Sequence, residues 1–155
     1  MSAQDVGAYG EQIVGLELAG ELYGVEIGRV QEIIRMQPTT VVPNGPAFVE
    51  GLTNLRGHVI PVMDLRKRFG LAASEPTRRS RIVVAEMGGH IVGLVVDAVS
   101  EVLRVDADQV EPPSSLVTTA ESAYLRGVAK LEERLVLLLD LSRILSTGEG
   151  EALAA

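Results

Sequence analysis

The sequence contains no cysteine and very few aromatic residues, and each shortage narrows what the chain can be. Without cysteine there are no disulfides and no thiolate metal ligands, which fits a reducing compartment. The aromatic residues are three Tyr and two Phe, with no Trp, so the core has to be built mainly from Val, Ile and Leu. Because β-branched residues are enriched in strands, this composition favours strands.

Long apolar runs and clustered positive charge are also scarce. The most apolar run, residues 135–139, is far shorter than the roughly 20 residues of a membrane helix. Residues 1–10 lack the basic and apolar regions of a signal peptide. The formal net charge of −7 opposes nonspecific binding to nucleic acid or anionic lipid. We therefore expect a soluble cytoplasmic protein without membrane insertion, and we interpret the local basic group at residues 66–68 and 78–81 as solvated surface.

The chain of 155 residues has the length of one self-sufficient domain. Residues 1–10 and 148–155 carry no periodic apolar pattern, which predicts disordered tails. Residues 11–147 form the predicted domain. It divides into subdomains at roughly 11–73 and 81–147, on either side of a polar stretch.

The two subdomains are related by an internal repeat. Shifting the sequence by 69 places Ile13, Val14, Glu17, Gly20, Gly24, Val30, Glu32 and Arg35 on Ile82, Val83, Glu86, Gly89, Gly93, Val99, Glu101 and Arg104. Shifting it by 76 places Gly51, Leu55, Asp64 and Leu65 on Gly127, Leu131, Asp140 and Leu141. The longer offset marks an insertion in the second copy, between Arg104 and Gly127. Two related units therefore make up the chain.

Each unit follows the same predicted plan. A strand (12–18 or 81–87) reaches a glycine turn at Gly20 or Gly88-Gly89 and returns as a second strand. The apolar spacing in residues 27–34 and 96–103 then predicts a helical turn or two against the core. Several short strands with regular turns indicate small barrels rather than a parallel sheet.

The first unit ends in a glycine turn at Gly57, an apolar strand over 59–63 and a short helix that Gly70 ends. Asp64 is predicted to cap this helix, and Asp140 the matching helix of the second unit. Packing does not require a long charged side chain at the tip of the turn, so Arg56 is free to contact a partner or only solvent.

Groups for catalysis are few. Neither His58 nor His90 has a nearby acid in a known catalytic spacing, and no cluster of metal ligands exists. No glycine-rich segment has the spacing of a phosphate-binding loop, and the scattered aromatics do not form a stacking platform for nucleic acid. We therefore predict no enzyme activity, no metal and no cofactor, which leaves protein binding.

Several segments resemble the CheW family of bacterial chemotaxis coupling proteins. They are Tyr23–Ile27, Val30–Ile34, Val42–Asn44, Asn54–Gly70, Gly93–Asp97 and Gly127–Leu131, and the likeness runs from about Glu11 to Leu145. The resemblance implies an all-β fold with short helices, in which two five-stranded SH3/OB-like barrels lie side by side and partly exchange strands. It also implies a non-catalytic adaptor that couples methyl-accepting chemoreceptors to the histidine kinase CheA in receptor arrays.

The same resemblance implies residues for receptor binding: Glu32 and Arg56, with Val30 and Ile33 as apolar neighbours. The repeat supports Arg56, because this position is Glu132 in the second copy and the charge is reversed. Val30 and Ile33 recur as apolar residues in the second copy, so a simple core role stays open for both. Glu32 likewise recurs as Glu101.

For the regulatory domain of the kinase, the candidate anchor is Leu116 in the inserted segment, which could equally be plain surface loop. Two alternative functions stay open. One is a chemosensory pathway controlling pili or surface motility, and the other is a hydrolase in which Asp64 and Asp140 converge in a pocket.

Overall fold

The computed structural model describes residues 10–113 and 121–144, which form eleven strands and a few short helical turns. The first repeat contributes β1 (Glu11–Leu18), β2 (Glu21–Glu26), the 3-10 helix η1 (Ile27–Arg29), β3 (Val30–Arg35), β4 (Val49–Leu55), β5 (His58–Asp64) and α2 (Leu65–Arg68). The second contributes β6 (Arg81–Met87), β7 (His90–Val96), β8 (Ala98–Val105), η2 (Ala107–Gln109), β9 (Val110–Glu111), η3 (Glu121–Tyr124), β10 (Leu125–Leu131), β11 (Arg134–Leu139) and α3 (Leu141–Ile144). The predicted all-β class with short helices is confirmed.

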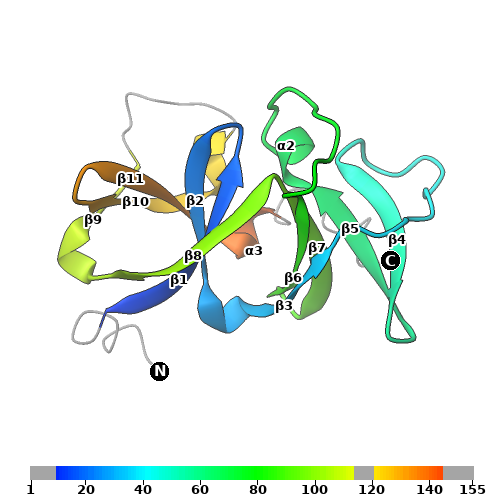
Figure 1. Cartoon of the computed structure of the whole chain (residues 1–155), viewed down its shortest axis with the longest axis horizontal. Helices are drawn as coiled ribbons and strands as arrows, with labels where there is room; N and C mark the ends of the chain where they lie inside the picture. Colours follow the sequence, from blue (N-terminus) through cyan, green and yellow to red (C-terminus); the bar gives the residue numbers. More distant parts are fainter. Residues whose placement is uncertain (1–9, 114–120, 145–155) are drawn as a thin grey trace.

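The strands form two sheets that lie side by side (Figure 1). One is six-stranded in the order β8-β1-β2-β11-β10-β9, and the other is five-stranded in the order β3-β6-β7-β5-β4. The sixth strand is the two-residue β9, which pairs with β10. Each sheet contains strands of both repeats, because β3 pairs with β6 and β8 pairs with β1.

Three of the hairpins turn through two residues with positive φ. These pairs are Ala19-Gly20 (50° and 81°), Arg56-Gly57 (52° and 84°) and Gly88-Gly89 (58° and 85°). Two successive left-handed residues are the mark of a type I′ turn, whose twist matches that of the flanking strands. The predicted turns at Gly20, Gly57 and Gly88-Gly89 are therefore confirmed.

The helical turns expected over 27–34 and 96–103 are wrong for most of their length. Only Ile27–Arg29 is helical in the first segment, and Val30–Arg35 is strand β3. The second segment runs from β7 into β8. Exposure alternates along β3, as expected of a strand with one solvated face. A register shift with β6 between Val30 and Glu32 interrupts the two-residue alternation of apolar side chains, so their spacing resembles that of a helix.

The largest core cluster lies between the two sheets and draws side chains from both, as well as from α2 and α3. Within it, the Phe69 ring stacks on Tyr124, with centroids 5.3 Å apart, and lies tilted against Tyr23 at 5.8 Å. Arg68 lies against the rings of Phe48 and Tyr124 and donates to the carbonyl of Ile144 at 2.8 and 3.0 Å. Two smaller clusters consist of buried side chains from the six-stranded sheet and from the five-stranded sheet, respectively. Arg68 thus belongs to the packing between the halves and not to solvated surface.

Candidate functional site

Arg56 lies at the tip of the β4–β5 hairpin, as the sequence predicts. Its backbone φ is 52°, and the Asn54 side chain supports the turn by accepting a hydrogen bond from the Gly57 amide at 2.9 Å. The Arg56 side chain is 73% exposed. The turn therefore presents a cation to solvent on a short and well-defined hairpin.

The Arg56 guanidinium forms a two-pronged ion pair with Glu32 on β3. The two nitrogen–oxygen distances are 2.5 and 2.7 Å, and the Glu32 side chain is 23% exposed. Since β3 and β4 are the two outer strands of the five-stranded sheet, this pair joins its opposite edges. Parallel N–H···O bonds of this kind fix both partners in orientation as well as distance.

The second repeat contains a corresponding pair. Glu101, the counterpart of Glu32, bonds to Arg134 of the β10–β11 hairpin at 2.9 Å. Arg134 lies two positions beyond Glu132, the residue that matches Arg56, so the arginine has moved along the hairpin. An ion pair of this type is thus common to both halves. The tip cation is found only in the first, because Glu132 occupies the tip of the second.

A groove of about 710 Å³ opens beside the Arg56–Glu32 pair. Its walls include His58 and Val59 of β5 and His90 at the start of β7. Val59 is 65% exposed, so the groove offers an apolar surface next to the ion pair. The two histidines, predicted only to lie beside hairpin glycines, line the same groove.

The two apolar candidates on β3 lie in different surroundings. Val30 is partly buried and packs against the core between the sheets. Ile33 is 41% exposed and available for contact. The structure brings Arg56 and Glu32 together and leaves Ile33 on the outer side of the same strand as Glu32. Leu116 lies outside the described residues.

Asp64 and Asp140 lie in separate places. The Asp64 carboxylate accepts from the Arg66 amide at 2.9 Å, and that of Asp140 accepts from the Ser142 amide at 3.1 Å, so both are the predicted N-caps. Asp64 lines a hollow of about 360 Å³ that does not include Asp140. The carboxylate pair that a hydrolase would need is therefore not assembled.

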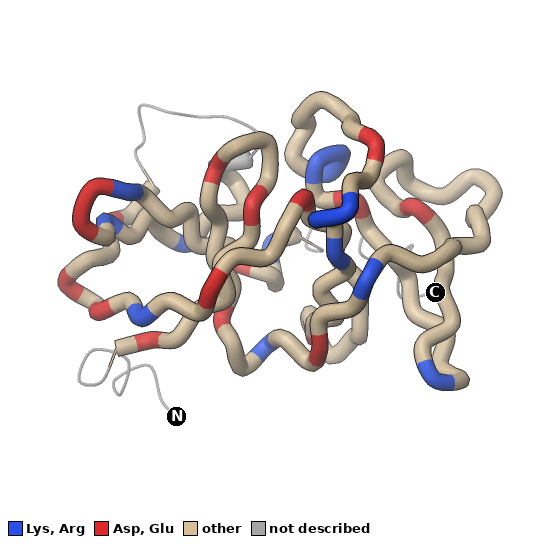
Figure 2. The backbone as a smooth tube through the Cα atoms, viewed as in Figure 1, with Lys and Arg blue, Asp and Glu red and all other residues tan. Residues whose placement is uncertain are grey.

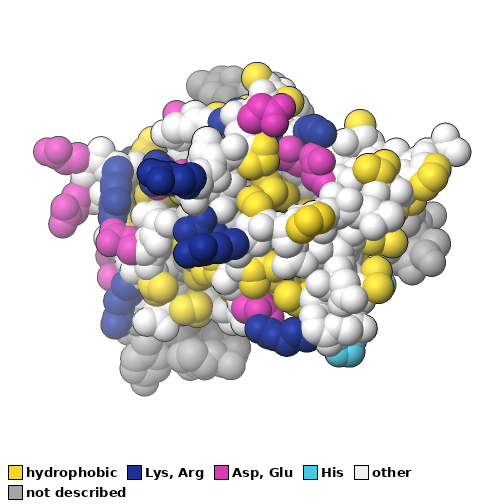
Figure 3. Space-filling view, turned by 45° about the vertical axis from the view of Figure 1, so that its right-hand side comes forward, with side chains coloured by type: hydrophobic (Ala, Val, Ile, Leu, Met, Phe, Trp, Pro, Cys, Tyr) yellow, Lys and Arg dark blue, Asp and Glu magenta, His cyan; other side chains and the backbone are white. Residues whose placement is uncertain are grey.

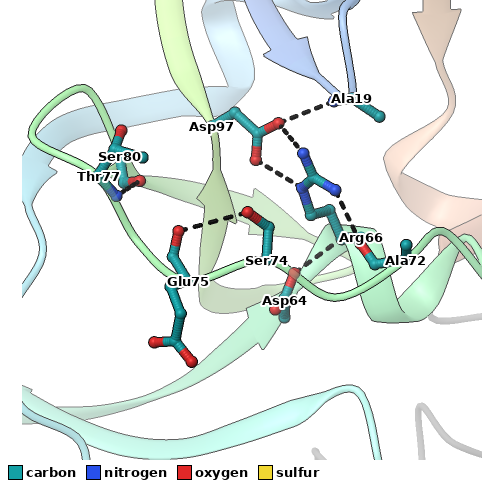
Figure 4. A network of polar contacts seen from close by, with 9 residues as sticks. All are labelled: Ala19, Asp64, Arg66, Ala72, Ser74, Glu75, Thr77, Ser80 and Asp97. Carbon is teal, nitrogen blue, oxygen red and sulfur yellow. Dashed lines mark hydrogen bonds and ion pairs between the residues drawn. The ribbon is translucent and has the colours of Figure 1, made fainter.

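The hollow beside Asp64 contains a polar network that the sequence did not reveal (Figure 4). The Arg66 guanidinium donates to both carboxylate oxygens of Asp97 at 2.7 and 2.8 Å and to the carbonyl of Ala72 at 2.8 Å. Asp97 also accepts from the Ala19 amide at 2.8 Å. The network ties α2 to the β1–β2 hairpin through Asp97, which directly follows β7.

Two carboxyl groups in this region have shifted pKa values. The hydrogen bond from Arg66 lowers the pKa of Asp97. Burial raises the pKa of Asp64, and the nearby Glu50 raises it further. Glu50 is itself paired with Lys67 at 2.9 Å, and its hydrogen bond raises the pKa of the lysine. The two ion pairs thus tie α2 to β4 and to the end of β7.

Across residues 10–113 and 121–144, no three His, Cys, Asp or Glu side chains converge in a way that could hold a metal ion. In the same part of the chain, no helix has the length and apolar character needed to cross a membrane.

Comparison with known proteins places the chain in a family. A family profile described as a CheW-like domain matches residues 12–149. The chain is 36% identical over 143 residues to the chemotaxis protein CheW of Rhizobium meliloti, covering 92% of each chain. It is also 36% identical over 140 residues to that of Klebsiella aerogenes, covering 90% of this chain and 84% of the relative.

A solved structure gives the same result. The crystal structure of the scaffolding protein TtCheW from Thermoanaerobacter tengcongensis superposes with a TM-score of 0.83 at 38% identity, covering 90% of this chain and 95% of the other. The chain therefore belongs to the CheW family, the non-catalytic adaptor and scaffolding proteins of chemotaxis.

Proposed function

We propose that this adaptor couples the cytoplasmic tips of methyl-accepting chemoreceptors to the regulatory domain of a CheA-type histidine kinase. It would work in the cytoplasm at membrane receptor arrays. A conformational change in the receptor alters kinase activity because both partners contact the same rigid adaptor. The adaptor contributes a coupling free energy between the two binding sites and catalyses no reaction.

The receptor side is assigned to the groove beside Arg56. The main support is the bidentate Arg56–Glu32 pair at its rim, where the arginine is fixed in orientation and still 73% exposed. Arginine is favoured at interface hot spots because its planar group pairs with carboxylates and stacks on apolar surface. Val59 offers exposed apolar contact in the groove. Val30 supports β3 from the core side, and Ile33 lies on the other face of that strand from Glu32.

The kinase side is assigned to a second surface, with Leu116 as the candidate anchor. Replacement of Leu116 by Asp should weaken binding of the kinase regulatory domain at least tenfold and leave the receptor fragment bound. If both partners bind the Leu116→Asp variant as they bind wild type, the kinase contacts lie elsewhere.

The receptor assignment is tested with Arg56→Glu, measuring binding of a receptor signalling fragment and of the kinase regulatory domain by titration calorimetry. The variant should lose at least tenfold in affinity for the receptor fragment and keep its affinity for the kinase domain. The matched control is Arg134→Glu, which breaks the corresponding ion pair of the second repeat and should leave receptor binding intact.

A charge exchange separates direct contact from structural support. Arg56→Glu combined with Glu32→Arg restores an ion pair between the hairpin and β3 but removes the cation from the tip. If Arg56 contacts the receptor, the double variant stays defective. Full recovery of receptor binding would show that the pair only holds the sheet edges together.

A further inference from the structure

Arg35 at the end of β3 lies directly opposite Arg81 at the start of β6. The Cβ atoms of opposed residues in antiparallel strands are only about 5 Å apart, and like charges at such positions are destabilising. Among the described residues, neither arginine forms an ion pair. By contrast, the neighbouring Arg79 is paired with Glu17 at 2.8 Å. The fold thus keeps two adjacent cations without a neutralising acid.

The repeat shows that this arrangement belongs to one half only. The counterpart of Arg35 is Arg104 on β8, and the residue opposite it is the uncharged Gln12. Arg104 also has an acid nearby, Asp106, at 3.8 Å. The second copy therefore relieves the repulsion that the first copy retains, which suggests a task that only the first copy performs.

The arginine surface is held in place and bordered by apolar contact area. Arg81 donates to the carbonyls of Arg78 and Ser80, both at 2.8 Å, which orients its guanidinium. Exposure alternates along β3, so Ile33 shares the outer face of the strand with Arg35. Figure 2 shows the blue segments of the tube gathered where β6 begins, beside the end of β3. In the space-filling view, two dark-blue groups lie next to each other near the middle of the face, and yellow side chains border them (Figure 3).

We propose that Arg35 and Arg81 form a binding surface for an acidic segment of a partner protein, with Ile33 contacting an apolar residue of that segment. A carboxylate placed between the two guanidinium groups relieves their repulsion and forms charge-assisted hydrogen bonds. Protein is the favoured partner because one segment supplies both the acid and the apolar contact. The surface is separate from the groove beside Arg56, although both use β3.

The test is an NMR titration of the isotope-labelled full chain with a synthetic peptide that carries pairs of glutamates around a central leucine. Saturable shifts are expected at the amides of Ile33, Arg35 and Arg81. The affinity for the peptide obtained from these shifts should fall at least tenfold when the salt is raised from low to physiological concentration, because the contact is charged and exposed. A peptide with glutamine in place of glutamate should cause none of them.

Arg35→Glu gives a distinctive signature. It places opposite charges across β3 and β6, so the midpoint of thermal unfolding should rise while peptide binding is lost. The matched control, Arg104→Glu in the second copy, should leave the peptide titration unchanged.

Three results would overturn the proposal. The peptide could cause no saturable shifts at Arg35 and Arg81. Arg104→Glu could weaken binding as much as Arg35→Glu. Finally, inorganic phosphate could shift the same amides at lower concentration than the peptide, which would assign the surface to small anions.

Discussion

Arg66 and Asp97 form the ion pair that links α2, the last element of the first repeat, to the end of β7. The guanidinium donates to both carboxylate oxygens, and the Ala19 amide donates to one of them. Their side chains are 18% and 33% exposed, so solvent weakens the pair without removing it. These contacts join three segments that are far apart in the sequence.

Replacing Asp97 by Asn should lower the free energy of unfolding at neutral pH by about 1 kcal/mol, since a charge-assisted hydrogen bond is lost and a third of the side chain is exposed. The folded-state pKa of Asp97 lies below its ordinary value of 3.8. The stabilisation is therefore fully present above the ordinary pKa and is lost as the pH falls through the lowered one. Urea unfolding from pH 7 down to pH 3 checks this. A difference between wild type and variant that stayed constant down to the lowest pH would contradict it.

Arg56 and Glu32 were predictable from the sequence as individual site residues, but the ion pair between them was not. Both residues were singled out, because the family resemblance points to them and the repeat reverses the charge at residue 56. Their contact was not predicted, since it joins positions 24 apart across the edges of a sheet. The matching Glu101–Arg134 pair was missed for the same reason, with the arginine displaced by two positions.

The short helices α2 and α3 are each begun by an aspartate whose carboxylate accepts an amide hydrogen bond. Such caps follow local sequence rules, so Asp64 and Asp140 were predictable. The type I′ turns were predictable as well, because they depend on glycine within two residues. The strand character of β3 and β8 was not, because it depends on pairing with β6 and β1.

Asp64→Ala should lower the free energy of unfolding by about 0.5–2 kcal/mol, because the first turn of α2 loses its acceptor. Asp64→Asn is the control. It keeps the side-chain oxygen and removes a charge that burial disfavours, so its stability should stay within a few tenths of a kcal/mol of wild type. Chemical denaturation measures both. Equal stability of the Ala variant and wild type would show that the cap contributes nothing.

The two halves of the molecule depend on each other because their sheets exchange strands. β1 and β2 need β8 and β11 of the second repeat, and β5 needs β7. The repeat and the barrel class were evident from the sequence. The exchange came only from the family resemblance, since offsets between repeats say nothing about which copy a strand pairs with.

This exchange predicts a single cooperative unfolding transition for the whole chain. A fragment ending at residue 79 should remain unfolded alone, because β3 and β5 lose β6 and β7. Circular dichroism and calorimetry check both expectations, and mixing this fragment with residues 80–155 should restore the strand signal. Two resolved transitions, or a folded N-terminal fragment, would show that the halves are independent.

The most direct test of the adaptor role is whether one molecule holds both proposed partners at once. The measurement is sedimentation velocity of the protein mixed with a receptor signalling fragment and a kinase regulatory domain, each with its own chromophore. A complex that contains all three components, and that sediments faster than either binary complex, is the predicted result. Displacement of one partner by the other, or failure of both to bind, would contradict a two-surface adaptor.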